Sequence, residues 1–595
     1  MRLGTRKLSI TGLVVVIGTL AMLLSACGSS TSGTQVAPPD KQIFKPLSGG
    51  ANAGDLDTLD PGAIQFGVDY DKAQMIFPQL ITLTDDLKPI DWAAKSHEIS
   101  SDGKTYTFHL NSGMKWSDGK AIDANTFAYS INRSLDPCFA SPVSYYNLNI
   151  VGATDYSSKT CDAGTDGLDK TAATALIGKS IVVADPLTLK VTIEAPAAYF
   201  LSEMSYPTFW GVPKQLIDQH GQTKWFDHLQ DGSGFGGNLY KLTRWQHPTP
   251  TSLGSLRFDR NERFWGQKPL LSRIGYTLYH DANRLWQDFA QGAGDVAVSV
   301  PSALFASIRA IKGISIQQTR MLSYWFVRLN WDVAPFDDVR VRQAFSLALD
   351  RNALLLQGFP SPQANLSPET IRAYRQPTIH LVPEGMPGYN PDLTDAAGRK
   401  GADALTPDRD AARALARAYA AERCGGDYAK CPPITIPRPT RSPSSANVVA
   451  EAVLDQARRA FPGWVIQLEE IGGVELKVVP PLQVLLDGWG ADYPDPQDFL
   501  SLLWTTHAPL NYPSESHVSV PLVDALLAQA DGMSDQTARL PLYQLAEQLL
   551  VNQGAAIPLY QPLQNDAVRS RVRGWHIAPT LQTPLAVWQT AYLTR

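Results

Sequence analysis

The stretch Gly488-Trp489-Gly490-Ala491-Asp492-Tyr493-Pro494-Asp495-Pro496-Gln497-Asp498-Phe499-Leu500 follows an apolar run, Val484-Leu485-Leu486, that has the length of a buried strand. Its glycines let the backbone approach a bound molecule closely, and its prolines predict an extended loop rather than a helix. Trp489 and Tyr493 have flat apolar faces with a polar edge, and Asp492 is a charged hydrogen-bond acceptor. A buried turn whose aspartates bind their own backbone is equally compatible with this composition.

Length and composition narrow the class of protein. The chain has 595 residues, of which 44% are hydrophobic and 18% are charged, and this is typical of an ordered globular protein with several domain-sized units. Its net charge of -5 gives no electrostatic footprint for nucleic acid. We therefore expect no nucleic-acid partner.

The stretch at 488–500 resembles the Gly-Trp-x-x-Asp-Tyr-x-x-Pro signature of the peptide/nickel class of extracellular solute-binding proteins, bacterial family 5, which feed ABC importers. Other parts of the chain resemble conserved blocks of the same family. These blocks are Asp57-Thr58-Leu59-Asp60-Pro61, Trp116 to Pro137, Asn261 to Ile274, Phe336 to Arg351, Val382 to Tyr389 and Ile557 to Tyr560. The resemblance therefore covers nearly the whole mature chain.

This resemblance implies an α/β fold with mixed sheets, the two-lobed type II periplasmic-binding-protein fold of cluster C, enlarged by an extra subdomain. Two short crossovers between the lobes, near 316–322 and 558–565, are expected to act as the hinge that closes them on a ligand. The expected domains are lobe I over 46–318, with the extra subdomain at about 78–210, lobe II over 319–562, and a return to lobe I over 563–595.

The N-terminus predicts export. A basic start at Arg2, Arg6 and Lys7 precedes an apolar run that ends in Leu24-Ser25-Ala26-Cys27, which reads as a lipobox. Residues 1–27 are expected to be a lipoprotein signal peptide and residues 28–45 a flexible tether. By resemblance to bacterial lipoproteins, Cys27 is acylated and anchors the protein to the outer face of the cell membrane or in the periplasm. The alternative is a transmembrane helix, for which the apolar run is barely long enough.

Four further cysteines remain, and an exported chain meets an oxidising compartment. We expect the disulfides Cys138–Cys161 and Cys424–Cys431, because the members of each pair lie close in sequence. A zinc site is the rival, but no histidine lies near either pair at ligand spacing. Neither a metal nor a cofactor is predicted. We expect a monomer.

The resemblance also assigns the binding residues. In peptide-binding relatives the aspartate at the position of Asp492 receives the α-amino group of the ligand, and the tryptophan at the position of Trp489 frames the site. Backbone groups of Gly488 and Gly490 are expected to bind an extended peptide. No arginine or lysine can be assigned to a terminal carboxylate, which leaves dipeptide binding in doubt. Further candidates are Tyr493, Tyr324, Asn330, Gln65 and Val68.

We therefore expect a lipid-anchored binding component that captures oligopeptides for the permease of an ABC importer. A saccharide, a nickel complex, an opine or a glutathione-like compound is an alternative cargo on the same fold, and a surface sensor without transport is another alternative. No catalytic motif of the Gly-x-Ser-x-Gly, His-Glu-x-x-His or Ser-x-x-Lys type stands in a convincing setting. We therefore predict that the protein is not an enzyme.

Overall fold

The structure of the protein is a computed structural model. It describes residues 35–49, 54–161, 175–357, 367–439, 444–471, 482–511, 516–580 and 582–595. The predicted signal peptide and Cys27 lie outside the described residues. Within these ranges, no helix combines the length and the apolar character needed to cross a membrane.

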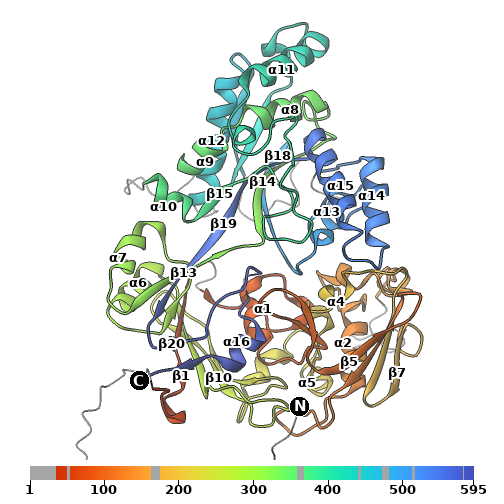
Figure 1. Cartoon of the computed structure of the whole chain (residues 1–595), viewed down its shortest axis with the longest axis vertical. Coiled ribbons are helices and arrows are strands. Elements are labelled where there is room, and N and C mark those ends of the chain that lie inside the picture. The colour runs from red at the N-terminus through yellow and green to blue at the C-terminus, as the bar shows by residue number, and fades with distance from the viewer. Residues whose placement is uncertain are drawn as a thin grey trace, which may run out of the picture.

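Two lobes stack along the long axis of the molecule, and one sheet runs through both (Figure 1). The sheet contains parallel and antiparallel pairs, and helices cover it. Its strand order is β18 (Val484–Gly490), β14 (Ser323–Leu329), β19 (Ala556–Arg569), β12 (Val296–Ala297), β2 (Pro46–Gly49), β11 (Arg273–Tyr279), β10 (Gly254–Arg260) and β9 (Tyr240–Gln246), with β1 (Ile43–Phe44), β13 (Ile314–Arg320) and β15 (Arg375–Pro377) paired outside this path. The predicted two-lobed α/β fold with a mixed sheet is confirmed.

The long strand β19 passes from one lobe to the other (Figure 1). Its first half pairs with β14 and its second half with β13, and only Met321 and Leu322 separate those two strands in sequence. The chain therefore crosses between the lobes twice at the same place. We call residues 35–320 together with 563–595 lobe I, and residues 321–562 lobe II.

Lobe I also contains a separate antiparallel sheet and most of the short helices. The sheet has the order β5 (Ala94–Ile99), β6 (Thr105–Leu110), β8 (Thr188–Thr192) and β7 (Ile181–Asp185), and β3 (Ile81–Leu83) pairs with β4 (Pro89–Asp91) and β20 (Val572–Arg573) with β21 (Tyr592–Leu593). The helices are α1 (Gly67–Ala73), α2 (Ala124–Ser134), α3 (Ala153–Ser157), α4 (Phe200–Glu203), α5 (Lys214–His220), α6 (Ala282–Ala290), α7 (Phe305–Arg309) and α16 (Leu585–Thr590).

Lobe II packs helices on both faces of β14, β18 and the first half of β19 (Figure 1). A parallel pair, β16 (Ile434–Pro439) with β17 (Ile466–Ile471), completes its strands. Its helices are α8 (Val339–Ala348), α9 (Arg351–Gln357), α10 (Pro368–Arg372), α11 (Arg409–Arg423), α12 (Ser444–Ala460), α13 (Pro496–Trp504), α14 (Pro521–Asp531) and α15 (Leu540–Gln553).

Local sequence explains several of these elements. On β6 the side chains of Tyr106, Phe108 and Leu110 are buried and alternate with half-buried ones, as the period of a strand requires. Asp123 begins α2, because its carboxylate accepts hydrogen bonds from the N–H groups of Asn125 and Thr126. Both the strand and the capped helix therefore follow from signals in a few adjacent residues.

The fold begins earlier than the sequence indicated. Residues 35–45 were assigned to the flexible tether, but in the structure they are part of lobe I. Phe44 is buried against Trp575 and Trp588, and β1 pairs in parallel with β11. The Ser, Gly, Thr and Pro content of residues 28–45 suggested a linker, yet the second half of it is held by the buried ring of Phe44, by strand pairing and by hydrogen bonds of Gln42 with Ala37 and Leu593.

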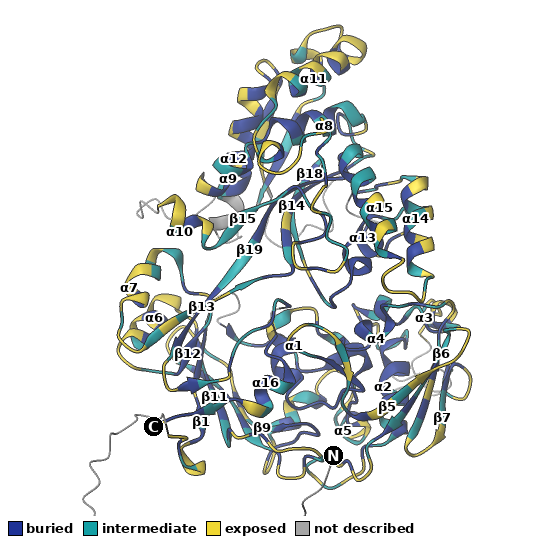
Figure 2. Cartoon of the chain, in the orientation of Figure 1, coloured by how far each residue is buried: buried dark blue, intermediate teal, exposed yellow. Residues whose placement is uncertain are grey.

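Buried residues concentrate in the strands and on the inner faces of the helices (Figure 2). On β14 the rings of Tyr324 and Phe326 stack with their centroids 4.7 Å apart and face the side of the sheet that α13 covers. Trp325 lies on the opposite face, where its ring stacks on Tyr560 at a centroid distance of 6.3 Å. The two faces of this strand therefore have different neighbours.

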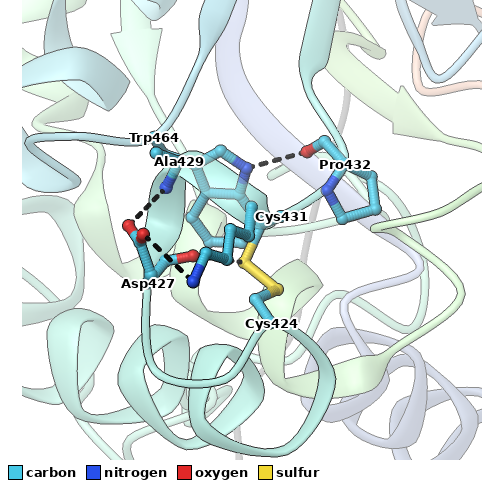
Figure 3. Close-up of a disulfide and its surroundings, with 7 residues drawn as sticks. Cys424, Asp427, Ala429, Cys431, Pro432 and Trp464 are labelled. Atoms are coloured by element: carbon cyan, nitrogen blue, oxygen red, sulfur yellow. Dashed lines mark hydrogen bonds and ion pairs between the residues drawn. A yellow bond between two sulfur atoms is a disulfide. The ribbon is translucent and has the colours of Figure 1, made fainter.

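Two disulfides are present, Cys138–Cys161 and Cys424–Cys431, with the pairing expected from the sequence. Figure 3 shows the second one, where Asp427 accepts a hydrogen bond from the N–H of Ala429 and Trp464 donates its indole N–H to the carbonyl of Pro432. The indole of Trp464 also stacks between Tyr419 and Tyr428. This disulfide closes the turn that follows α11.

Replacing Cys424 and Cys431 together by serine is expected to lower the free energy of unfolding by about 2–3 kcal/mol, because the unfolded chain regains the entropy of an open loop. The pair Cys138–Cys161 spans 23 residues instead of 7, so its removal should cost about 3–4 kcal/mol. Urea unfolding of both double variants beside the parent measures the difference. Equal stability of the parent and the 424/431 variant would show that this turn is held by its aromatic stack alone.

Candidate functional site

A cavity of about 460 Å³ lies between the two lobes. Lobe I contributes the chain around the start of α1 up to Tyr70, together with Tyr145 and Tyr206. Lobe II contributes the chain from Gly488 to Asp492, and the crossing contributes Met321, Leu322 and Ser323. A crevice of this size between two lobes is a common place for a small-molecule site.

The cavity wall is aromatic and nearly uncharged. Among the described residues that line it, Asp492 is the only one with a charged side chain. Its aromatic residues are Phe66, Tyr70, Tyr145, Tyr206 and Trp489. A lone carboxylate among aromatic rings favours a cation as the complementary group of a ligand.

Asp492 lies two residues after the end of β18 and is partly buried. The hydroxyl of Tyr146, in lobe I, donates a hydrogen bond to its Oδ2. Burial raises the pKa of Asp492 to about 7, and the hydrogen bond from Tyr146 opposes this rise. Near neutral pH this carboxyl group is therefore poised between its neutral and its charged form.

Asp498 lies outside the cavity wall and binds the backbone of Asp492. Its side chain is fully buried, and its Oδ2 accepts the backbone N–H of Asp492 at 3.0 Å. Burial, followed by the charge of Asp492, raises the pKa of Asp498 well above its usual range, and the hydrogen bond from the backbone N–H of Asp492 opposes this rise. Two coupled carboxyl groups at one place favour retention of a proton until a cation arrives.

Asp495 anchors the same segment to lobe II. Its carboxylate forms two hydrogen bonds with Arg539, of 2.6 and 2.7 Å, and 1% and 0% of the two side chains are exposed. It also caps α13 through the N–H of Gln497. The expectation that prolines hold 488–500 as an extended loop is wrong for its second half, because Pro496 is the first residue of α13, where proline needs no N–H.

The two lobes touch beside the cavity. The ring of Tyr199 in lobe I stacks on Tyr493 in lobe II with their centroids 6.3 Å apart, and the guanidinium of Arg539 lies 5.1 Å from the same ring of Tyr199. The backbone N–H of Ala198 donates to the carbonyl of Met533 at 3.1 Å. The structure therefore has the lobes in contact along this side.

Five of the nine sequence-predicted binding residues line the cavity: Gln65, Gly488, Trp489, Gly490 and Asp492. The glycines differ in the room around them. A Cβ on Gly488 would lie 3.1 Å from the ring of Trp325, whereas a Cβ on Gly490 would meet only Ser323, at 3.6 Å. A side chain at 488 would therefore need the indole of Trp325 to shift by a few tenths of an ångström.

The other four lie elsewhere. Tyr324 and Tyr493 are fully buried, the first under α13 and the second between Tyr199 and Tyr146. Asn330 is buried just beyond the far end of β14, where its side chain accepts the N–H of Asp332. Val68 is exposed on α1 next to the cavity wall. The structure does not place these four side chains in the wall.

The tyrosines of lobe I were not among the binding residues predicted from the sequence. Tyr70, Tyr145 and Tyr206 line the cavity. Tyr146 does not line it, but its hydroxyl group binds Asp492. They come from three separate segments and belong to none of the quoted family blocks. The adjacent pair Tyr145-Tyr146 was the only local signal, and an aromatic pair is common in cores.

Comparisons with known proteins agree with this architecture. The chain is 26% identical over 535 residues to the dipeptide-binding protein DppE of Bacillus subtilis, covering 88% of each chain. It is 26% identical over 533 residues to the periplasmic oligopeptide-binding protein OppA of Escherichia coli, again covering 88% of each chain. Among solved structures, the Escherichia coli murein tripeptide binding protein MppA matches 94% of this chain and 100% of its own, with 20% identity and a TM-score of 0.72.

The family comparison covers most of the described chain. The family model for the bacterial extracellular solute-binding proteins, family 5 Middle, matches residues 88–509. This match spans well over half of the sequence and includes the segment that holds Trp489 and Asp492. The protein therefore belongs to family 5 of the bacterial extracellular solute-binding proteins.

Proposed function

We propose that this chain is the substrate-binding component of an ABC importer and that it captures peptides by their amino end. The observation that carries the proposal is that Asp492, which lines the cavity between the two lobes together with Trp489, is the only charged side chain among the described lining residues. A carboxylate in such surroundings binds an ammonium group through charged hydrogen bonds. The names of the dipeptide- and oligopeptide-binding relatives support peptides as the cargo.

The backbone of lobe II suits an extended ligand. Among the described strands, β18 stands at one end of the sheet order, and it places Gly488 and Gly490 in the cavity wall. A peptide that adds to such an edge gains main-chain hydrogen bonds that do not depend on its side chains. This arrangement supports binding of many sequences with one amino-terminal anchor.

Hinge closure is part of the proposal. The lobes are joined at two adjacent crossings, and Gln561 in one of them donates hydrogen bonds to the carbonyls of Met321 and Glu384 at 2.7 and 2.9 Å. Few residues need to change their dihedral angles for the lobes to open there. Small-angle scattering should show a smaller radius of gyration when a ligand is added, and an unchanged radius would remove closure from the proposal.

The lipid anchor is proposed from the sequence at Cys27. Replacing Cys27 by alanine should release the protein from membranes into the soluble exported fraction, because a lipid chain without a spanning helix is the only anchor proposed. Metabolic labelling with palmitate checks the same point. A variant that stays on the membrane would show that another segment holds it there.

Native mass spectrometry of the purified protein tests the cargo. We expect peptides with free amino ends to be retained in the cavity. Retention of a saccharide, an opine or a metal complex instead would replace peptides by one of the alternative cargoes. A nickel complex has no support among the described residues, where no group of three or more histidine, cysteine, aspartate or glutamate side chains is placed to hold a metal.

Peptide affinity is expected to depend on pH through Asp492. With the lobes in contact as in this structure, burial raises the pKa of this carboxyl group to about 7, and a bound ammonium lowers it, so affinity should fall about tenfold per pH unit below pH 7. Above about pH 8 the peptide loses its own ammonium charge, so affinity falls again. Calorimetric titration over this pH range measures the affinity at each pH. An acetylated peptide should show neither the fall at low pH nor the fall at high pH. A flat profile for the free peptide would contradict the role of Asp492.

A further inference from the structure

The wall around Asp492 is a continuous set of tyrosine rings. The centroid of Tyr146 lies 4.4 Å from that of Tyr145 and 4.1 Å from that of Tyr206, and Tyr206 lies 6.1 Å from Tyr70. Tyr70, Tyr145 and Tyr206 line the cavity itself. The carboxylate therefore meets a curved aromatic surface that lobe I supplies as one unit.

These rings are held by hydrogen bonds that leave their orientation fixed. The hydroxyl of Tyr70 donates to the carbonyl of Ser205 at 2.8 Å, and the hydroxyl of Tyr206 donates to the carbonyl of Ile64 at 3.2 Å. The hydroxyl of Tyr146 donates to Asp492. Three hydroxyl hydrogens are thus committed inside the protein, and the rings of Tyr70 and Tyr206 need no ligand to place them.

The charge of Asp492 acts on three of these tyrosines. Burial and then the negative charge of Asp492 raise the pKa of Tyr145, Tyr146 and Tyr206 above its usual range. A negative field at a hydroxyl group disfavours phenolate, so the rings stay neutral and keep their negative faces. Neutral aromatic faces around a carboxylate are the surroundings that attract an organic cation.

We propose that the pocket formed by Tyr70, Tyr145, Tyr206 and Trp489 around Asp492 is an aromatic box that accepts a methylated or quaternary ammonium group as well as a primary amine. The inference rests on the proposed function in one respect, that Asp492 is the counter-charge of the ligand. A quaternary ammonium needs no hydrogen-bond acceptor, only negative charge and aromatic faces. The cavity, about 460 Å³ with no cation among its described lining residues, has room for the added methyl groups.

The test uses the full-length mature protein and one library of tripeptide amides in three forms, with a free, a trimethylated and an acetylated amino end. Tetramethylammonium is added as a separate probe of the box alone. Because the trimethylated end keeps its charge at every pH, its affinity should lack the loss above about pH 8 that a free amine shows. We expect the trimethylated library to bind within about threefold of the free library or more tightly, and the acetylated library to be weak.

Two variants separate the ring from its hydroxyl group. Tyr145→Leu removes the aromatic face and should weaken the trimethylated library and tetramethylammonium roughly 2- to 30-fold, whereas Tyr145→Phe keeps the ring and should leave both unchanged. Thermal melting confirms that each variant is folded. Equal losses in the two variants would overturn the box, because the hydroxyl group and not the ring would then bind the ligand.

The outcomes distinguish this inference from the peptide proposal. In one outcome the free library binds, the trimethylated library binds more than about tenfold more weakly, and tetramethylammonium does not bind. The box is then overturned and the peptide proposal stands. If tetramethylammonium binds and depends on Asp492 and Tyr145 while no peptide binds, the box is supported and peptides are wrong. If none of the probes binds, both are overturned.

Discussion

The variant Asp492→Asn is expected to bind peptides with a free amino end about 10- to 150-fold more weakly, because a hydrogen bond to a charged group contributes about 1.5–3 kcal/mol. Asparagine keeps the shape of the side chain and can still accept the hydroxyl of Tyr146. It removes the only negative charge among the described residues of the cavity wall. Acetylated peptides should bind the variant and the parent equally. Calorimetric titration of both peptide forms at constant pH gives the ratio.

The control is a carboxylate of the same lobe that has no connection with the cavity. Asp455 lies on α12 in an exposed pair with Arg459 at 2.5 Å, with 53% of each side chain exposed. Asp455→Asn changes the net charge by the same amount and should leave both affinities unchanged. If Asp492→Asn weakens the free and the acetylated peptide equally, Asp492 supports the pocket wall and does not receive the amine.

The architecture could be predicted from the sequence because its signals are local. Asp123 and the alternating side chains of β6 predict an element from a few adjacent residues, and the family blocks predict how such elements are joined. The predicted tether failed for a related reason. The contacts that hold its second half are distant in sequence: Phe44 packs on Trp575 and Trp588, and Gln42 bonds to Leu593, all more than five hundred residues away.

The site could be predicted only in part, because each lobe contributes to it separately. Gly488, Trp489 and Asp492 lie within five consecutive residues, so one motif identifies all three. The tyrosines that face them come from lobe I and have no common spacing. Tyr324 was expected in the site, but the run of apolar residues on β14 does not show which face each side chain takes, as is usual for a strand buried on both faces.

The ion pair between Asp495 and Arg539 anchors the segment that follows Asp492. Breaking this pair is expected to have the largest effect on stability. Arg539→Met should lower the free energy of unfolding by about 3–5 kcal/mol, because it leaves the carboxylate of Asp495 buried without its partner. Arg539 also donates to Gln536 and contacts the ring of Tyr543. Urea or thermal unfolding of the variant beside the parent measures the loss.

A double-variant cycle separates the pair from simple loss of packing. Asp495→Asn combined with Arg539→Met removes both charges. The double variant should lose about 1–3 kcal/mol less free energy of unfolding than the two single variants lose together. Lys214→Met is the matched control, because Lys214 pairs with Asp218 at the surface and should change stability by less than about 1 kcal/mol. Additive single effects would mean that the two groups do not stabilise each other. Coupling together with weaker peptide binding in Arg539→Met would show that the ion pair holds the start of α13, and with it the carboxylate, in the geometry that binds the ligand.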